Sequence, residues 1–497
     1  MQRRTPDRAV EDRRDPVSAR LSDATLAGLP ATIEKPRYAL DAVQIGVVHF
    51  GPGAFHRAHQ AWYFDDALAR DPRWAISAVS LKSPGPRDAL AAQDGLYTVA
   101  VLDAEVRMRV IGALRELLVA SEKRERVFAR LAAPTTTIVT LTITEKGYCL
   151  RADGTLDFDH ADIAADLADP RAPVSAPGYL VEGLRRRRVV GLPPFTTISC
   201  DNLADNGGKL GRAVVELARA QDAGLARWIE VAAAFPRTMV DCIVPATDAA
   251  LEQRAAMALG VVDAWPVQRE AFSQWVIEDR FCNATPDWAA LGVSVTDDVA
   301  GFERAKLRLL NGAHSTLAYL GLLRGLVTVA DAIADAELAG FIERLMRTDI
   351  LPSVASPAGF DAGADVGDVL ARFRNPAMHH ALAQIAWDGS QKLPFRVLGT
   401  IRDALGAGRP VERLCVPIAA WLHFVRAAQR EGRKLIDPLA TELCDRAAAC
   451  DGDASHDVGL FLGMGQVFAD DLPAQLRFVA ALERAYAAIA RGIDVLI

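Results

Sequence analysis

One apolar stretch near the middle of the chain, residues 302–323 (FERAKLRLLNGAHSTLAYLGLL), contains four polar side chains that constrain how it can fold. At about 100° per residue in an α-helix they share an arc of roughly 140°: Glu303, Lys306, Asn311 and His314. Polar residues at helical spacing usually form the wet face of an amphipathic helix. The following STLAYLGLL leaves little polar surface to expose, and a buried ammonium or imidazole without partners is costly. The stretch therefore predicts a buried helix with a functional site on one side.

The residue types on that side suit the chemistry of a carbonyl group. A lysine among apolar side chains loses solvation of its charged form, so its pKa falls toward neutrality and Lys306 becomes a candidate acid/base. The amide N–H of Asn311 could hold a carbonyl oxygen on which charge develops. His314 could orient the lysine or bind a substrate hydroxyl. Carbonyl reduction fits this set.

Size and charge bound the remaining possibilities. The 497 residues suffice for two or three domains. A net charge of -7 argues against nucleic acid or an anionic membrane as the main partner, which leaves small molecules.

Seven scattered cysteines without a CxxC pair or zinc-type spacing predict reduced thiols in a cytoplasmic protein and no metal site. Because no run of about eighteen apolar residues occurs, no membrane span is expected.

The amino-terminal segment is expected to be a disordered leader, residues 1–40. Its first twenty residues, MQRRTPDRAVEDRRDPVSAR, mix arginines with acids around no apolar core. For the same reason they form neither a signal peptide nor a twin-arginine signal.

A strand, a glycine turn and a helix follow the leader. AVQIGVVHF (42–50) predicts the strand, GPGAFHRAH the turn and AWYFDDALAR the helix. Gly51 and Gly53 occupy the first two glycine positions of a GxGxxG turn, and His56 stands where a third glycine or alanine is usual. Such glycines let the backbone approach a pyrophosphate, whose charge the next helix N-terminus favours. The motif alone is weak, and an ordinary glycine turn is the alternative.

Strand and helix patterns alternate through the first 296 residues. Helix is predicted for ALRELLVASEKRERVFARL (113–131), and strands for WAISAVS (74–80), TVAVLD (98–103), TIVTLTIT (137–144) and FTTISCDN (195–202). This alternation predicts an α/β fold, a Rossmann-like doubly wound and mainly parallel sheet, over residues 41–296. Almost every later segment has a helical pattern, so residues 297–497 are predicted to form a mainly α-helical domain, with the active site between the two.

The end of the second predicted strand lacks one element of the dinucleotide fingerprint. An acidic residue is expected there to hold the adenosine ribose hydroxyls, but Lys82 and Arg87 stand in its place. They could pair with the 2′-phosphate of NADP or remain solvated loop charges. The choice between NAD and NADP stays open.

Two other strand ends supply polar residues where an open α/β sheet binds ligands. TLTITEKGY ends in Thr144, Glu145 and Lys146, and TTISCDN ends in Asp201 and Asn202. Asn202 could equally be a cap or turn residue.

Further candidates for substrate contact have the same ambiguity. Asp241 lies in FPRTMVD, the pair His379–His380 in the helical half, and Lys392 in WDGSQKLPFR. Asp241 could, like Asn202, be a cap or turn residue, whereas each of the other candidates alone is more often a surface residue.

Several motifs occur together in one order: GPGAFHRAH, TEKGY, SCDN, FPRTMVD and the pattern K-x4-N-x2-H. On these motifs the chain resembles, from about Ile45 onward, the polyol-specific long-chain dehydrogenases, the family of mannitol 2-dehydrogenase and fructuronate reductase. The resemblance implies metal-independent hydride transfer between a nicotinamide cofactor, NAD or alternatively NADP, and the C2 carbonyl of a ketose or keto-sugar acid. A monomer or small homo-oligomer is expected.

The resemblance also implies roles for individual residues. Lys306 is the implied acid/base, and Glu303 a proton-relay group behind it. Asn202 and Asn311 would clamp the carbonyl oxygen, while His314 would orient the substrate. The implied cofactor contacts come from the two glycine-containing turns: Gly51, Gly53, Phe55, Thr144 and Glu145.

Within the family, TEKGYC, the PDW at residues 286–288, WDGSQKLP and GQVFADDLP look closer to fructuronate reductases than to mannitol dehydrogenases. Fructuronate has a carboxylate that fructose lacks, and Lys146 or Lys392 could pair with it by a charge-assisted hydrogen bond. With Asp241 these are the expected substrate contacts, although Lys146 could instead face the cofactor phosphates. The sequence thus favours D-fructuronate and D-mannonate, with a mannitol 2-dehydrogenase as the alternative enzyme and a dinucleotide-sensing protein without chemistry as the non-enzymatic one.

Overall fold

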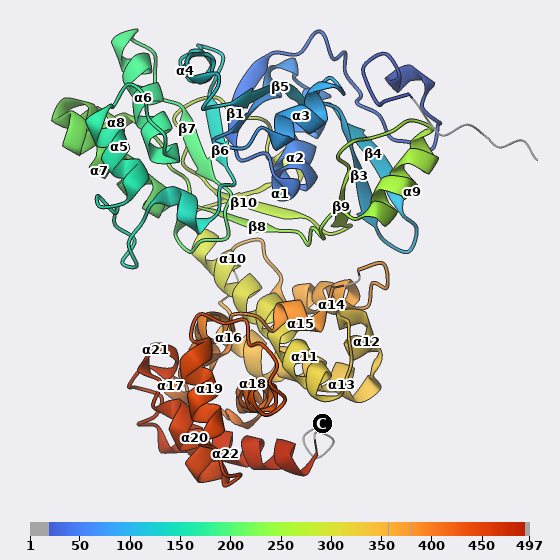
Figure 1. Cartoon of the computed structure of the whole chain (residues 1–497), viewed down its shortest axis with the longest axis vertical. Helices are drawn as coiled ribbons and strands as arrows, with labels where there is room; N and C mark the ends of the chain where they lie inside the picture. The colour runs from blue at the N-terminus through green and yellow to red at the C-terminus, as the bar shows by residue number, and fades with distance from the viewer. Residues whose placement is uncertain (1–18, 356, 379, 493–497) are drawn as a thin grey trace, which may run out of the picture.

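The computed structural model describes residues 19–355, 357–378 and 380–492. A body built around β-sheets and a body of helices are joined by one helix, α10 (Val299–Lys306), which runs from the first into the second (Figure 1). The last strand, β11 (Ser294–Thr296), ends just before this helix. None of the described helices is both long and apolar enough to cross a lipid bilayer.

The central sheet has five parallel strands in the order β5-β2-β1-β6-β7. These are β5 (Leu114–Val119), β2 (Ala75–Ser80), β1 (Ile45–Phe50), β6 (Ile138–Leu141) and β7 (Thr196–Ser199). The chain moves outward from β1 in one direction and then returns to its other side, so the strand order reverses between β1 and β6. Ligands of doubly wound sheets bind at such a switch point. The predicted Rossmann-like fold is confirmed.

The strands of this sheet are mostly buried because helices cover both of its faces. Val48 packs in a core with α4 (Arg124–Leu131), α6 (Ala176–Val189) and α7 (Asn206–Gln221), while Val47 packs in a second core with α2 (Gln60–Leu68). The remaining helices of this body are α1 (Ala54–Ala58), α3 (Gly85–Ala91), α5 (Ala161–Ala168), α8 (Ala223–Ala232) and α9 (Ala249–Leu259).

One predicted helix is wrong in its first half. In ALRELLVASEKRERVFARL, residues 114–119 form edge strand β5 and only residues 124–131 are helical. Leu, Arg and Glu favour helix by only a few tenths of a kcal/mol per residue. Parallel pairing with β2 outweighs that preference.

Two three-stranded sheets flank the central one. The strand predicted at TVAVLD is β3 (Tyr97–Leu102), which pairs with β4 (Arg107–Ile111) and β9 (Val267–Glu270) rather than joining the central sheet. The other sheet combines β11, β10 (Gln274–Glu278) and β8 (Thr238–Asp241). It lies beside α10, so the end of β8 faces the helical body (Figure 1).

The expectation of a disordered leader is wrong for residues 19–40. Leu21, Leu29 and Ile33 are buried in a core that includes Leu251 of α9, and the Leu21 N–H donates to the carbonyl of Val262 at 2.9 Å. Apolar residues beyond the charged first twenty therefore fix this segment on the sheet body. Residues 1–18 lie outside the described residues.

The helical body continues α10 through a π-helical turn (Leu307–Asn311) into α11 (Gly312–Leu323). The helices that follow are α12 (Val329–Ala334), α13 (Ala336–Arg344), α14 (Ala362–Phe373), α15 (Leu382–Ile385), α16 (Gly389–Leu393), α17 (Gly399–Gly406), α18 (Glu412–Arg430), α19 (Ala440–Ala448), α20 (Ala454–Leu462), α21 (Gly465–Phe468) and α22 (Leu476–Arg491). Two more π turns cover Leu345–Ile350 and Pro394–Leu398.

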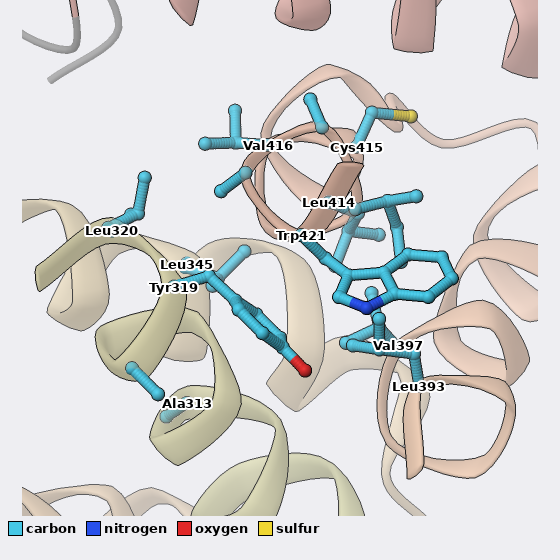
Figure 2. Close-up of a cluster of buried hydrophobic side chains, with 14 of the residues drawn as sticks. Ala313, Tyr319, Leu320, Leu345, Leu393, Val397, Leu414, Cys415, Val416 and Trp421 are labelled. Atoms are coloured by element: carbon cyan, nitrogen blue, oxygen red, sulfur yellow. The ribbon is translucent and has the colours of Figure 1, made fainter. Parts of the chain in front are cut away.

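The core of this body fixes the position of α16. Figure 2 shows Tyr319 of α11 and Trp421 of α18 within one cluster of buried side chains. A Cβ on Gly389 would collide with both the Trp421 indole nitrogen and the Tyr319 hydroxyl, so only glycine fits the start of α16. This close approach anchors the helix that carries Lys392.

Candidate active site

A pocket of about 450 Å³ opens at the carboxyl ends of three neighbouring strands, β1, β2 and β6. Gly51, just after β1, has a φ of 90°, and a Cβ there would collide with the carbonyl of Thr142. The position of a Cβ on Gly53 has no neighbour closer than 3.9 Å, so its face is open to a ligand. These two glycines form a backbone cradle that fits the pyrophosphate of a dinucleotide. Phe55 follows on α1, where its ring stacks on His59 at 5.1 Å.

The turn after β6 is strained and held by one carboxylate. Thr144 has a φ of 63°, which is rare for a β-branched residue and costs on the order of 1–3 kcal/mol. Asp201 accepts hydrogen bonds from the N–H groups of Ile143 and Thr144, at 3.0 and 2.9 Å, and from the hydroxyl of Tyr148. Thr144 and Glu145 are exposed beside the cofactor pocket as a result.

Lys146 lies on this same turn, exposed, and lines the pocket of Gly51. It does not line the cavity around Lys306. The structure thus places Lys146 at the pocket of Gly51 and not at the cavity of Lys306.

The two cations at the end of β2 are already paired with acids. Lys82 Nζ lies 3.1 Å from Asp162, while Arg87 pairs with Asp88 at 2.7 Å and also with Glu122. Each of these cations already pairs with a negatively charged carboxylate. A 2′-phosphate, which is also negative, would have to displace that carboxylate in order to bind, so the cation is less available to it.

Lys306 is the centre of a second, small cavity between the two bodies. Its Nζ donates to the carbonyl of Val240 at 2.6 Å and to Asn202 Oδ1 at 3.4 Å. No carboxylate forms an ion pair with it among the described residues. Burial lowers the pKa of Lys306, because the charged form loses hydration.

Asn202 comes from the end of β7, so the structure joins two residues that are 104 positions apart. Since its Oδ1 faces the lysine, its NH₂ group is left to donate to a ligand.

The π turn changes the face on which the predicted residues lie. It adds one residue to the helical turn and rotates everything after it back by roughly 100° relative to an ideal α-helix. The predicted angles to Lys306 of about 140° for Asn311 and 80° for His314 become roughly 40° and −20°. The turn therefore brings both side chains closer to the lysine face than the sequence implied.

Asn311 and His314 are both available to a ligand. The Asn311 side chain is half-buried and has no hydrogen bond to another described residue. His314 is buried, stacks on Phe373 at 5.3 Å and meets His380 edge-on at 4.8 Å. Its Nε2 has no partner among the described residues, and burial lowers its pKa well below the ordinary value. A neutral imidazole with one unpaired nitrogen suits a substrate hydroxyl better than proton donation. His379 lies outside the described residues.

Glu303 lies one helical turn before Lys306 and makes no hydrogen bond to it. Burial raises the pKa of Glu303, so its carboxyl group keeps a proton up to a higher pH than that of an exposed glutamate. A proton relay between the two would need a bridging water.

Asp241 lines the Lys306 cavity but is already in an ion pair. Arg372 of α14 contacts Asp241 at 2.8 Å and Glu270 of β9 at 2.7 Å, and all three side chains are nearly inaccessible. Asp365 lines the cavity too, and burial raises its pKa to about 6. This network ties the helical body to the sheet body next to the lysine.

Sequence analysis missed Arg372, Glu270 and Asp365. Arg372 and its partners are separated by 131 and 102 residues, and an arginine on an amphipathic helix gives no local sign of such pairing.

Lys392 of α16 does not line the Lys306 cavity. Its Nζ makes only a 3.4 Å contact to the carbonyl of Ile385 and pairs with no carboxylate among the described residues. Burial, aided by the charge of Arg396, lowers its pKa. The Lys306 cavity thus has acidic side chains around Arg372, and Lys392 is a cation without a carboxylate partner among the described residues.

Comparisons with known proteins cover both bodies. Residues 45–290 match the mannitol dehydrogenase Rossmann domain, and residues 298–490 match the mannitol dehydrogenase C-terminal domain. The chain is 41% identical to the D-mannonate oxidoreductase of Escherichia coli, over 91% of this chain and 95% of that protein. Among solved structures, the substrate-free D-sorbitol dehydrogenase has a TM-score of 0.88 at 34% identity, covering 96% of this chain and 99% of that one. The Pseudomonas fluorescens mannitol 2-dehydrogenase, in ternary complex with NAD and D-mannitol, has a TM-score of 0.81 at 35% identity, covering 96% and 98%.

Proposed function

The chain belongs to the mannitol dehydrogenase family and is an oxidoreductase, and we propose that it interconverts D-fructuronate and D-mannonate with NAD as its cofactor. The observation that carries the proposal is the half-buried Lys306, whose ammonium has two neutral acceptors and no carboxylate ion pair among the described residues. A protein that only bound a dinucleotide would have no use for such a costly group.

In the proposed mechanism Lys306 gives its proton to the carbonyl oxygen of the keto acid during reduction. The NH₂ groups of Asn202 and Asn311 hold that oxygen while negative charge develops on it. His314 accepts or donates a hydrogen bond at a neighbouring hydroxyl and so fixes the sugar chain. Bound nicotinamide supplies the hydride. In the oxidation direction the neutral form of Lys306 takes the proton from the alcohol.

The cradle at Gly51 and Gly53 fits a dinucleotide, since side chains there would collide or block its approach. The pairing of Lys82 with Asp162 supports NAD over NADP. Support for NAD also comes from the mannitol 2-dehydrogenase structure, which contains that cofactor.

Two observations support the sugar acid as substrate. The D-mannonate oxidoreductase is 41% identical to this chain, and the half-buried Lys392, which pairs with no carboxylate among the described residues, offers a positive charge to a carboxylate. The competing proposal is a mannitol 2-dehydrogenase acting on D-fructose. It is favoured by the structural likeness to an enzyme in complex with D-mannitol.

The deciding experiment is the steady-state oxidation of NADH and NADPH by the purified protein with D-fructuronate and D-fructose. We expect kcat/KM to favour D-fructuronate by about a hundredfold or more, which is roughly 2.7 kcal/mol of transition-state discrimination. NADH should be the better reductant with either sugar. A preference for D-fructose would replace the proposal by the mannitol-type enzyme.

A further inference from the structure

Arg396 is a half-buried cation that the mechanism above does not use. It belongs to the π turn Pro394–Leu398, directly after α16, and its Nη1 donates to the hydroxyl of Ser315 at 2.9 Å. No carboxylate pairs with it among the described residues, and burial lowers its pKa to about 10. It remains charged at neutral pH. A guanidinium has five N–H donors, so most of its hydrogen-bonding capacity is open.

The surroundings of Arg396 show that it belongs to the active site. Ser315 is the residue after His314, on the helix that carries Lys306 and Asn311. The charge of Arg396 is close enough to lower the pKa of Lys306 and of His314. The π turn that carries Arg396 also packs against the π turn Leu307–Asn311, so Arg396 lies beside the helix that carries the proposed site residues.

Arg372 and Arg396, whose charges both act on Lys306, differ in whether carboxylates neutralise them. Arg372 is neutralised by two buried carboxylates at 2.7 and 2.8 Å. Arg396 has only a neutral hydroxyl and the nearby cation Lys392, which add no negative charge. Leaving a charge buried without a counter-ion is expensive, and a ligand that supplies the counter-ion removes that cost.

We propose that Arg396 binds the carboxylate of the sugar-acid substrate, at the end of the chain remote from the reacting carbonyl, and thereby selects acids over neutral ketoses. The planar fork of a guanidinium matches a carboxylate with two parallel hydrogen bonds. Ser315 holds the fork in place. The acids around Arg372, namely Asp241, Glu270 and Asp365, would repel a carboxylate, which favours an orientation with the carboxylate at Arg396. This inference rests on the proposed function, because it names the group that recognises the acid.

The test compares Arg396→Gln with the wild-type enzyme on D-fructuronate and D-fructose, and measures binding of D-mannonate and D-mannitol by calorimetry. We expect kcat/KM for D-fructuronate and affinity for D-mannonate to fall about thirtyfold or more, with the values for the neutral sugars within threefold. Arg402→Gln is the matched control. That arginine lies on α17, pairs with Asp471 at 2.6 Å, and should leave both substrates unaffected.

Two more variants test the role of Arg396 if Arg396→Gln does not fold. Arg396→Lys keeps the charge but loses the fork, and Ser315→Ala frees the guanidinium. Each should lower activity on D-fructuronate at least fivefold more than on D-fructose.

Equal losses on acid and neutral sugar, or no loss at all, would overturn the role of Arg396 while leaving the proposed function intact. If the wild-type enzyme itself fails to reduce D-fructuronate, the proposed function is wrong and this inference falls with it. The two failures are distinguished by the wild-type measurement.

Discussion

Replacing Lys306 by methionine removes the proposed proton donor while keeping most of the side-chain volume. The structure offers no substitute. Glu303 has no hydrogen bond to Lys306, and burial keeps His314 neutral. Positioned acid/base groups contribute about 10²–10⁴ in rate, and without a stand-in the loss should reach the upper part of that range. We expect kcat to fall by about 10³–10⁴, or roughly 4–5.5 kcal/mol of barrier.

Binding of NADH should change little, since the cofactor cradle at Gly51 is separate from Lys306. The assay is steady-state reduction of D-fructuronate with NADH, alongside NADH binding followed by fluorescence. Lys434→Met, an exposed lysine of the helical body, is the control. If Lys306→Met retained activity within tenfold, Lys306 would not be the acid/base.

The proposed role of Lys306 also predicts the direction in which each rate changes with pH. Reduction needs protonated Lys306, so its rate should fall as pH rises through the pKa of this lysine. Oxidation needs the neutral form, so its rate should rise over the same range. Because burial lowers the pKa, both changes should occur below the ordinary lysine value. The Lys306→Met variant should lack them, and an unchanged profile in that variant would assign the titration to another group.

Two further predictions concern cofactor choice and stability. Asp162→Asn should free Lys82 for a 2′-phosphate and raise kcat/KM for NADPH relative to NADH several-fold, and an unchanged ratio would refute this role for Lys82. Arg372→Met should lower the free energy of unfolding by about 3–5 kcal/mol, because it leaves two carboxylates buried without their counter-ion. Burial already raises the pKa of Glu270, and loss of the arginine charge should raise it further, so the loss measured by denaturant unfolding should shrink as pH falls from 7 to 5. A loss no larger than that of exposed Arg374→Met would contradict the argument.

Much of the fold could be predicted because its signals are local. The strand, glycine turn and helix around Gly51 are contiguous, and the change from alternating patterns to helix patterns is visible along the chain. Lys306, Asn311 and His314 were found by spacing on one helix. The edge strand β5 was missed, since its residues favour helix locally and only pairing with β2 makes it a strand.

The residues of this protein alone determined a dinucleotide-type turn, a helical carboxyl-terminal half and a polar face within an apolar helix. These features depend on neighbours within a few turns of chain, where backbone geometry sets the spacing. Only the tertiary structure showed that the π turn rotates His314 toward the face of Lys306. It also showed that carboxylates neutralise Arg372, whereas Arg396 has no carboxylate partner among the described residues. Whether a buried charge has a partner depends on contacts between residues a hundred positions apart, and no local pattern records them.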